Sequence, residues 1–184
     1  MLTVARKEWQ WLSHNPMDQV KKNGEGGGRV RYLSEDERTA LLKETATDQQ
    51  LHCMVLLALS TASRAGELLR LEWRDVDLKE GLVLLGRRPG QQSRLETKNG
   101  SARATWISGE ALRLLKEHGK VRHLDDDRVF SSPGRSGGRG RYNYHDPFVS
   151  AVEAAGLDDF HFHDLRHSAA TYLARAGATD RRGT

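Results

Sequence analysis

The chain has 184 residues, of which 37% are hydrophobic, and a formal net charge of +4. That length fits one ordinary domain with a short appendage. No stretch approaches the roughly 20 consecutive apolar residues of a membrane helix, and the first residues show no apolar run typical of a secretory signal. A single cysteine, Cys53, excludes a disulfide framework or a cysteine-cluster metal site among these residues and fits a reducing compartment. We therefore expect a soluble, cytoplasmic, mildly basic domain.

Residues 1–28 are expected to form a helical remnant followed by a linker. Apolar residues recur at loose helical spacing from Leu2 to Leu12, and Asn15-Pro16 ends that pattern because proline disfavours helix in the residue before it. The glycine-rich run from Gly24 to Gly28 follows, a composition typical of flexible connections. The main domain is therefore expected to begin at residue 29.

Helices dominate the next part of the chain. Ser34 and Glu37 have the spacing of a capping box, which predicts a helix over roughly 35–46. The apolar run Leu51 to Leu59 predicts a buried helix. A short helix is expected to start near Arg64.

Strand signals follow these helices. Leu82 to Leu85 and Arg103 to Ile107 are rich in residues that favour β-structure. Asn99-Gly100 predicts a tight hairpin turn, because both central residues of a type I′ turn need positive φ. Lys98 would therefore lie at the lip of a hairpin.

The second half returns to helix. We expect a helix from Ser108 through His118, then a short strand or extension at Val129-Phe130 and a loop from Ser131 to Arg141. A helix capped by Asp146 before Pro147 and ended at Gly156 should follow, and a last helix from about Asp164 to Ala176 with Gly177 after it. The fold class that these elements predict is mainly α with a small antiparallel β-sheet (α+β).

Basic residues are segregated along the chain. One cluster is opposed only by Glu96, and a second lies in a glycine-rich stretch without acids: Arg87, Arg88, Arg94, Lys98 and Arg103, then Arg135, Arg139 and Arg141. Such segregation suits a surface that meets a polyanion such as DNA. Solvated basic loops are an equally good interpretation of charge alone.

Three segments carry side chains that suit phosphate chemistry: Arg64 at a helix start, Lys98 at the hairpin lip, and the run from His163 to His167 at another helix start. Two guanidiniums can each bind a phosphate through two parallel hydrogen bonds. Backbone N–H groups at helix starts favour an anion. A histidine transfers protons near neutral pH, and an ammonium can protonate a leaving oxygen.

Each of these residues also has an ordinary structural explanation. Arg64 beside Glu67 could form a surface ion pair, and a lysine in a hairpin turn could simply be solvated. His163 and His167, four residues apart, could be core histidines or, with His161 and Asp164, metal ligands. We predict no metal and no other cofactor, because no carboxylate-rich or cysteine-rich set accompanies the histidines.

Three motifs in order resemble those of the tyrosine recombinases, the phage integrase family, over about residues 29–179. The segment from Thr61 to Asp77 resembles the family's first-arginine box, and Thr97-Lys98-Asn99-Gly100 resembles its hairpin lysine. The run His163-Asp164-Leu165-Arg166-His167 is very similar to its His-x-x-Arg-His box. The resemblance implies a tyrosine recombinase catalytic-domain-like fold in residues 29–184, lacking its C-terminal part, preceded in residues 1–28 by a remnant of the core-binding (arm) domain and its linker.

The resemblance also implies roles for individual residues. Arg64 and Arg166 would hold the scissile phosphate and stabilise its pentacoordinate transition state. Lys98 would act as general acid toward the leaving 5′-oxygen, with His163 assisting proton transfer. Glu67 and His167 match positions that support the site. The basic clusters named above supply the candidate DNA contacts.

The sequence departs from the family pattern at two places, of which the first is minor and the second is not. Ala62 replaces a glycine that is usual two residues before the first arginine. The family's nucleophilic tyrosine follows the His-x-x-Arg box, and the tyrosines here are Tyr32, Tyr142, Tyr144 and Tyr172, none at that distance. Covalent chemistry needs that nucleophile. We expect a chain that binds double-stranded DNA but does not complete strand exchange alone.

Three functions remain open on the sequence. The first is site-specific DNA recombination or integration through a phosphotyrosine, represented by an incomplete catalytic domain. The second is a non-catalytic DNA-binding regulator, and the third is a histidine-rich metal-binding or interaction domain. The expected partners are double-stranded DNA and, on DNA, further copies of the chain, with no membrane and no small-molecule substrate.

Overall fold

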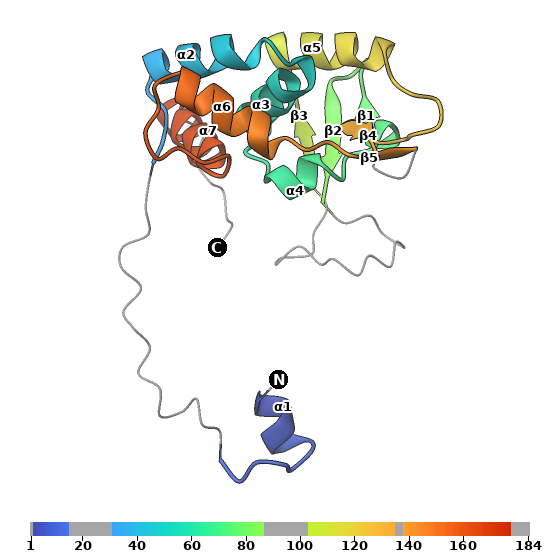
Figure 1. Cartoon of the computed structure of the whole chain (residues 1–184), viewed down its shortest axis with the longest axis vertical. Helices are drawn as coiled ribbons and strands as arrows, with labels where there is room; N and C mark the ends of the chain where they lie inside the picture. The colour runs from blue at the N-terminus through green and yellow to red at the C-terminus, as the bar shows by residue number, and fades with distance from the viewer. Residues whose placement is uncertain (1, 15–30, 87–102, 135–137, 178–184) are drawn as a thin grey trace.

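The computed structural model describes residues 2–14, 31–86, 103–134 and 138–177. A short helix, α1 (Leu2–Lys7), precedes the main body. The body begins with α2 (Glu35–Thr45), α3 (Gln49–Thr61) and α4 (Ala65–Leu68), and continues with a 3-10 turn, η2 (Trp73–Asp75) (Figure 1). Then come β1 (Val76–Asp77), β2 (Leu82–Leu85), β3 (Arg103–Trp106), α5 (Gly109–Lys120), β4 (Ser131–Pro133), β5 (Arg139–Arg141), α6 (His145–Ala154) and α7 (Asp164–Arg175). The predicted class, helices with a small antiparallel sheet, is confirmed.

The three-stranded sheet has the order β1-β2-β3, and both pairings are antiparallel. Val83 lies opposite Val76 on β1 and Thr105 on β3. Along β2, Val83 and Leu85 are buried while Leu84 is exposed. This alternation follows from the two-residue period of a strand, which turns every second side chain toward the core.

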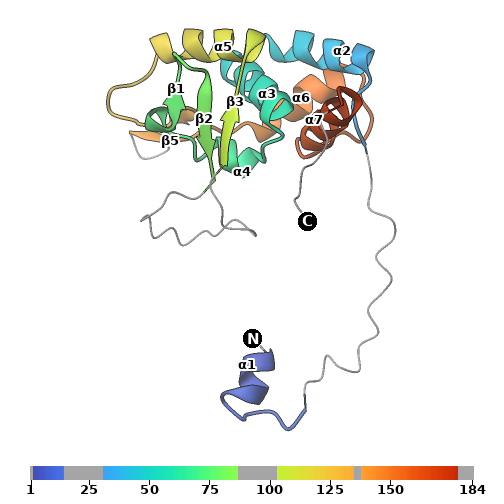
Figure 2. The ribbon, with the colours of Figure 1, turned by 180° about the vertical axis from the view of Figure 1, so that it is seen from behind.

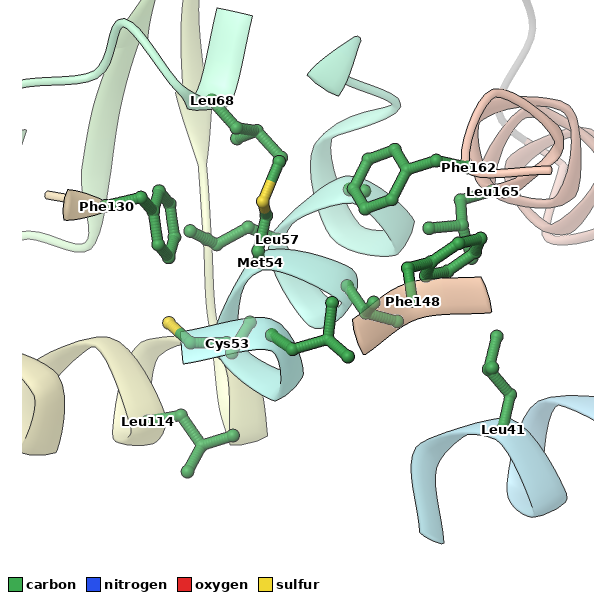
Figure 3. Close-up of a cluster of buried hydrophobic side chains, with 14 of the residues drawn as sticks. Leu41, Cys53, Met54, Leu57, Leu68, Leu114, Phe130, Phe148, Phe162 and Leu165 are labelled. Atoms are coloured by element: carbon green, nitrogen blue, oxygen red, sulfur yellow. The ribbon is translucent and has the colours of Figure 1, made fainter. Parts of the chain in front are cut away.

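Helix α3 forms the centre of the core. It packs against α2, α5 and α7, and the β1-β2-β3 sheet and α7 lie on opposite sides of it (Figure 2). Its residues Cys53, Met54 and Leu57 are fully buried. Figure 3 shows these side chains between Phe130 on one side and Leu165 of α7 on the other. Because α3 is enclosed on several sides, its sequence is apolar without interruption from Cys53 to Leu59. Burial also raises the pKa of the Cys53 thiol to about 12.

The predicted helix starts agree with the structure at Ser34 but not at Asp146. Ser34 and Glu37 form the full capping box, with hydrogen bonds of 3.2 and 2.8 Å. By contrast, Tyr144 occupies the N-cap position of α6 without a side-chain hydrogen bond to the helix, and Asp146 is the second residue of α6. Any of the first helical positions tolerates a proline, because their N–H groups have no partner within the helix. The pair Asp146-Pro147 therefore predicts where the first turn of α6 lies but not which residue occupies its N-cap position.

The loop expected from Ser131 to Arg141 is also different. Its two ends pair as the antiparallel hairpin β4-β5, with Ser131 opposite Arg141. Val129-Phe130, predicted as a strand or an extension, precedes β4 and belongs to no strand. Val129 and Phe130 are buried, so their apolar character reflects contact with the core. Among the described residues, no helix is long and apolar enough to cross a bilayer.

Candidate functional site

The site is built on the tight turn between α3 and α4, residues 61–64. Thr61 ends α3 and donates its hydroxyl proton to the Leu57 carbonyl at 2.7 Å. Ala62 then adopts φ 52° and ψ 35°, the left-handed conformation. An L-residue is strained there by roughly 1–2 kcal/mol, whereas glycine is not. This backbone conformation explains physically why a glycine would suit position 62, and Ala62 maintains the turn without one.

Arg64 caps α4 and projects into solvent from this turn. Its backbone N–H donates to Oε2 of Glu67 at 2.9 Å. Its guanidinium lies 3.6 Å from Oε1 of the same carboxylate, a loose contact, and its side chain is 47% exposed. The Arg64 guanidinium is therefore held near the turn while most of its donors stay available.

Glu67 is the buried anion of the site, with a side chain only 3% exposed. Arg103 donates to both of its oxygens, at 3.2 and 3.0 Å, and also to Oγ of Ser63 at 3.3 Å. Burial alone would raise the pKa of Glu67, but the hydrogen bonds from Arg103 and from the Arg64 backbone outweigh it and lower that pKa. Glu67 is thus a carboxylate at neutral pH.

The first turn of α7 brings the second arginine to the same place. Arg166 donates from Nη1 to the carbonyl oxygen of Ala62 at 2.5 Å. Its pKa is lowered by burial and by the positive charges of Arg64 and Arg103. Arginine stays protonated in proteins, so three cations surround one carboxylate. Arg64 and Arg166, which lie 102 positions apart in the chain, share one surface.

His163 caps α7 beside these arginines. Its ring lies 5.1 Å from that of His167, edge to face. The pKa of His163 is lowered by burial first and then by His167, Arg166 and Arg64. At neutral pH the imidazole is therefore predominantly neutral and able to accept a proton. Within the described residues, no group of three or more His, Cys, Asp or Glu side chains could hold a metal ion.

The backbone at the start of α7 does not supply the free N–H groups expected from a helix terminus. The N–H groups of Asp164, Leu165 and Arg166 donate to carbonyl oxygens of the preceding turn, at 2.9, 3.3 and 3.1 Å. Their donors are already used within the chain. Anion binding at this site is consequently a property of its side chains.

The other predicted residues divide into two groups. Lys98, Arg87, Arg88, Arg94 and Arg135 lie outside the described residues. Arg139 is largely buried in the β4-β5 hairpin, 3.7 Å from Asp126 and bonded to Ser131, whereas Arg141 is exposed. Arg103 is committed to Glu67 and Ser63.

The sequence pattern does not reveal two participants, the carbonyl of Ala62 and the hydroxyl of Ser63. A carbonyl carries no side-chain signal. Ser63 is buried, and its neighbours in the sequence do not show that it meets Arg103. Both contacts are long-range, spanning 104 and 40 positions.

The tyrosines make contacts elsewhere. The hydroxyl of Tyr172 donates to the Leu33 carbonyl at 2.9 Å, and that of Tyr142 donates to Asp48 at 2.5 Å. Tyr144 packs edge-on against Phe162 at 4.8 Å between ring centroids. Tyr32 lies under the guanidinium of Arg175.

The chain is similar to known proteins. Residues 31–182 match the model of the phage integrase family. The chain is 31% identical to the shufflon-specific DNA recombinase of Escherichia coli, over 97% of this chain and 42% of that protein, and 28% identical to the integrase of Salmonella phage P22, over 96% and 45%. The chain therefore spans less than half the length of these relatives. The type 1 fimbriae regulatory protein FimE of Escherichia coli K12 is 30% identical over 82% of this chain and 76% of its own.

Solved structures show the same fold. The crystal structure of XerA recombinase aligns with a TM-score of 0.65 and 25% identity, covering 82% of this chain and 53% of that chain. A lambda integrase (75-356) dimer bound to a COC′ core site aligns with a TM-score of 0.66 at 18% identity, over 99% and 69%. With the family model covering most of its residues, this chain belongs to the phage integrase family.

Proposed function

We propose that this chain binds double-stranded DNA and is the catalytic-domain part of a site-specific DNA breaking and rejoining enzyme. One observation carries the proposal: Arg64 and Arg166 converge on the turn 61–64 beside His163. We further propose that it acts in the cytoplasm, where its buried Cys53 would stay a thiol.

The charge of the site matches a phosphodiester. Arg64, Arg103 and Arg166 bring three positive charges and Glu67 one negative charge, so the site carries an excess of two positive charges. A phosphodiester brings one negative charge, which rises as a pentacoordinate transition state develops. Guanidiniums already held in place stabilise that charge without reorganising, and this is typically a large contribution to catalysis.

The proposed chemistry assigns each group one role. Arg64 and Arg166 donate to the non-bridging oxygens of the scissile phosphate. A hydroxyl nucleophile attacks phosphorus and gives up its proton to a neighbouring base, and neutral His163 is the base that we propose. The bond to the 5′-oxygen then breaks, and Lys98 supplies that oxygen with its proton. Glu67 and His167 support the arginines and His163.

The attacking hydroxyl is proposed to be none of the four tyrosines of these 184 residues. Tyr172 lies nine positions beyond His163, which corresponds to about 13 Å along α7. Its hydroxyl is bonded to Leu33, and that of Tyr142 to Asp48. These contacts favour a second candidate function for the chain alone, a DNA-binding regulator that holds phosphate without cleaving it.

DNA binding is tested with a fluorescent duplex whose affinity is measured over a series of salt concentrations. Affinity should fall steeply with salt, and Arg64→Ala or Arg166→Ala should each reduce the slope of log K against log salt by about one. Arg113→Ala is the matched control, because Arg113 is exposed on α5 and paired with Glu110. Unchanged slopes in both site variants would refute the phosphate site.

Cleavage is tested with a pool of nicked duplexes of randomised sequence, which trap any covalent intermediate. We expect no covalent protein–DNA adduct with the 184-residue chain. An adduct that mass spectrometry maps to any of its four tyrosines would overturn the assignment of the nucleophile and exclude the regulator.

A further inference from the structure

We propose that Arg103 is a positioning residue whose role is to occupy Glu67, so that the guanidinium of Arg64 stays available for phosphate. This inference rests on the proposed function, since it concerns the same site. It assigns to Arg103 a role different from that of a DNA contact.

The geometry commits Arg103 to the protein itself. Its two terminal nitrogens bind both oxygens of Glu67, and one of them also binds Ser63. Arginine has five N–H donors arranged in one plane, and a pairing with both oxygens of a carboxylate is among the strongest that it makes. A guanidinium engaged in this way has few donors left for a phosphate.

Arg103 bonds to residues on both sides of Arg64 in the chain. Ser63 and Glu67 flank Arg64, and Ser63 follows Ala62, whose carbonyl oxygen accepts from Arg166. Arg103 opens β3, and the beginning of β3 lies at the same edge of the molecule as α4 (Figures 1 and 2). Arg103 thus ties the sheet to the turn that carries Arg64 and whose Ala62 carbonyl accepts from Arg166.

Arg103 and Arg64 compete for the carboxylate of Glu67, and this competition determines whether the Arg64 guanidinium is available for phosphate. Arg103 lies 3.0 Å from Glu67, whereas the Arg64 guanidinium lies 3.6 Å away and is nearly half exposed. A buried carboxylate without a partner is costly. If Arg103 were absent, Glu67 would therefore draw Arg64 into a close pair and withdraw its donors from phosphate.

The test is a double-mutant cycle on the intact chain with Arg103→Gln, Glu67→Gln and the double variant. Arg103→Gln should weaken duplex binding about tenfold, the value of one charge-assisted contact. Adding Glu67→Gln should restore much of that loss, because a neutral amide no longer captures Arg64. If Arg103 instead contacts phosphate, the double variant will bind no better than Arg103→Gln, and the proposal is wrong.

A second measurement is independent of DNA. NMR titration should show the pKa of His163 rising in Arg103→Gln, because Arg64 moves toward Glu67 and away from the imidazole, and returning toward its original value in the double variant. Arg103→Lys should lie between, since one ammonium cannot bind both carboxylate oxygens and Ser63 in the same way. An unchanged His163 pKa in folded Arg103→Gln would refute the positioning role. Failure of Arg64→Ala to affect binding would instead refute the proposed function, so the two failures are distinguishable.

Discussion

Replacing Ser168 with alanine should destabilise the domain, because Ser168 holds the segment 31–34 against α7. The backbone N–H of Leu33 donates to Oγ of Ser168 at 2.9 Å, and both residues are fully buried. The same hydroxyl donates to the Asp164 carbonyl at 2.9 Å. Alanine would leave the Leu33 N–H without an acceptor in a place that water does not reach.

The expected magnitude follows from these contacts. A buried donor left without a partner costs about 1–3 kcal/mol, and the better helix propensity of alanine offsets up to about 0.5 kcal/mol of that. The free energy of unfolding should therefore fall by about 0.5–3 kcal/mol. For a domain of this size, that corresponds to a Tm lower by roughly 1–12 °C.

Chemical denaturation followed by circular dichroism measures this change. Ser60→Ala is the matched control, since Ser60 also donates to a carbonyl one turn earlier in its helix, that of Leu56, but is exposed. Its effect should stay within about 0.5 kcal/mol. If Ser168→Ala is no more destabilising than Ser60→Ala, the buried bond to Leu33 does not contribute as argued.

Two further predictions concern the site turn and a buried histidine. Ala62→Gly should raise the free energy of unfolding by about 0.5–1 kcal/mol, because glycine relieves the left-handed strain but gains freedom in the unfolded chain; a loss of stability would contradict this reading. His118 donates from Nε2 to the Val129 carbonyl at 2.6 Å, and burial lowers its pKa. The unfolded chain therefore binds a proton first as pH falls through about 6.5, so stability should decline from pH 7.5 to 5.5. Urea denaturation across that range should show a smaller decline in the free energy of unfolding for His118→Gln than for the unchanged chain. The remaining decline is due to His52 and His163, whose pKa values are also lowered. An equal decline in the variant would exclude His118 as a contributor.

Local patterns predicted most of the secondary structure. The capping box at Ser34 and the strand Leu82–Leu85 are read from residues within one turn or one strand of each other. The end of α6 is also predicted from a local pattern, since Gly156 follows the helix with the positive φ of 67° that a helix end often requires. Two expectations were wrong. Asp146 is not at the cap of α6, because a proline is tolerated at several first-turn positions, and the ends of the expected loop 131–141 pair as β4 and β5.

By itself, the sequence singled out Arg64, Arg166 and His163 as the candidates for phosphate chemistry, because their motifs are contiguous and in order. Only the tertiary structure showed that these side chains lie together at the turn 61–64. The sequence showed Arg103 only as one of a cluster of basic residues, and the structure pairs it with Glu67. The sequence marked Ala62 only as a departure at a turn, and the structure shows that its carbonyl oxygen accepts from Arg166. The physical reason is distance along the chain: hydrogen bonds and charges act over a few ångströms in space, and folding alone brings together residues that are tens of positions apart.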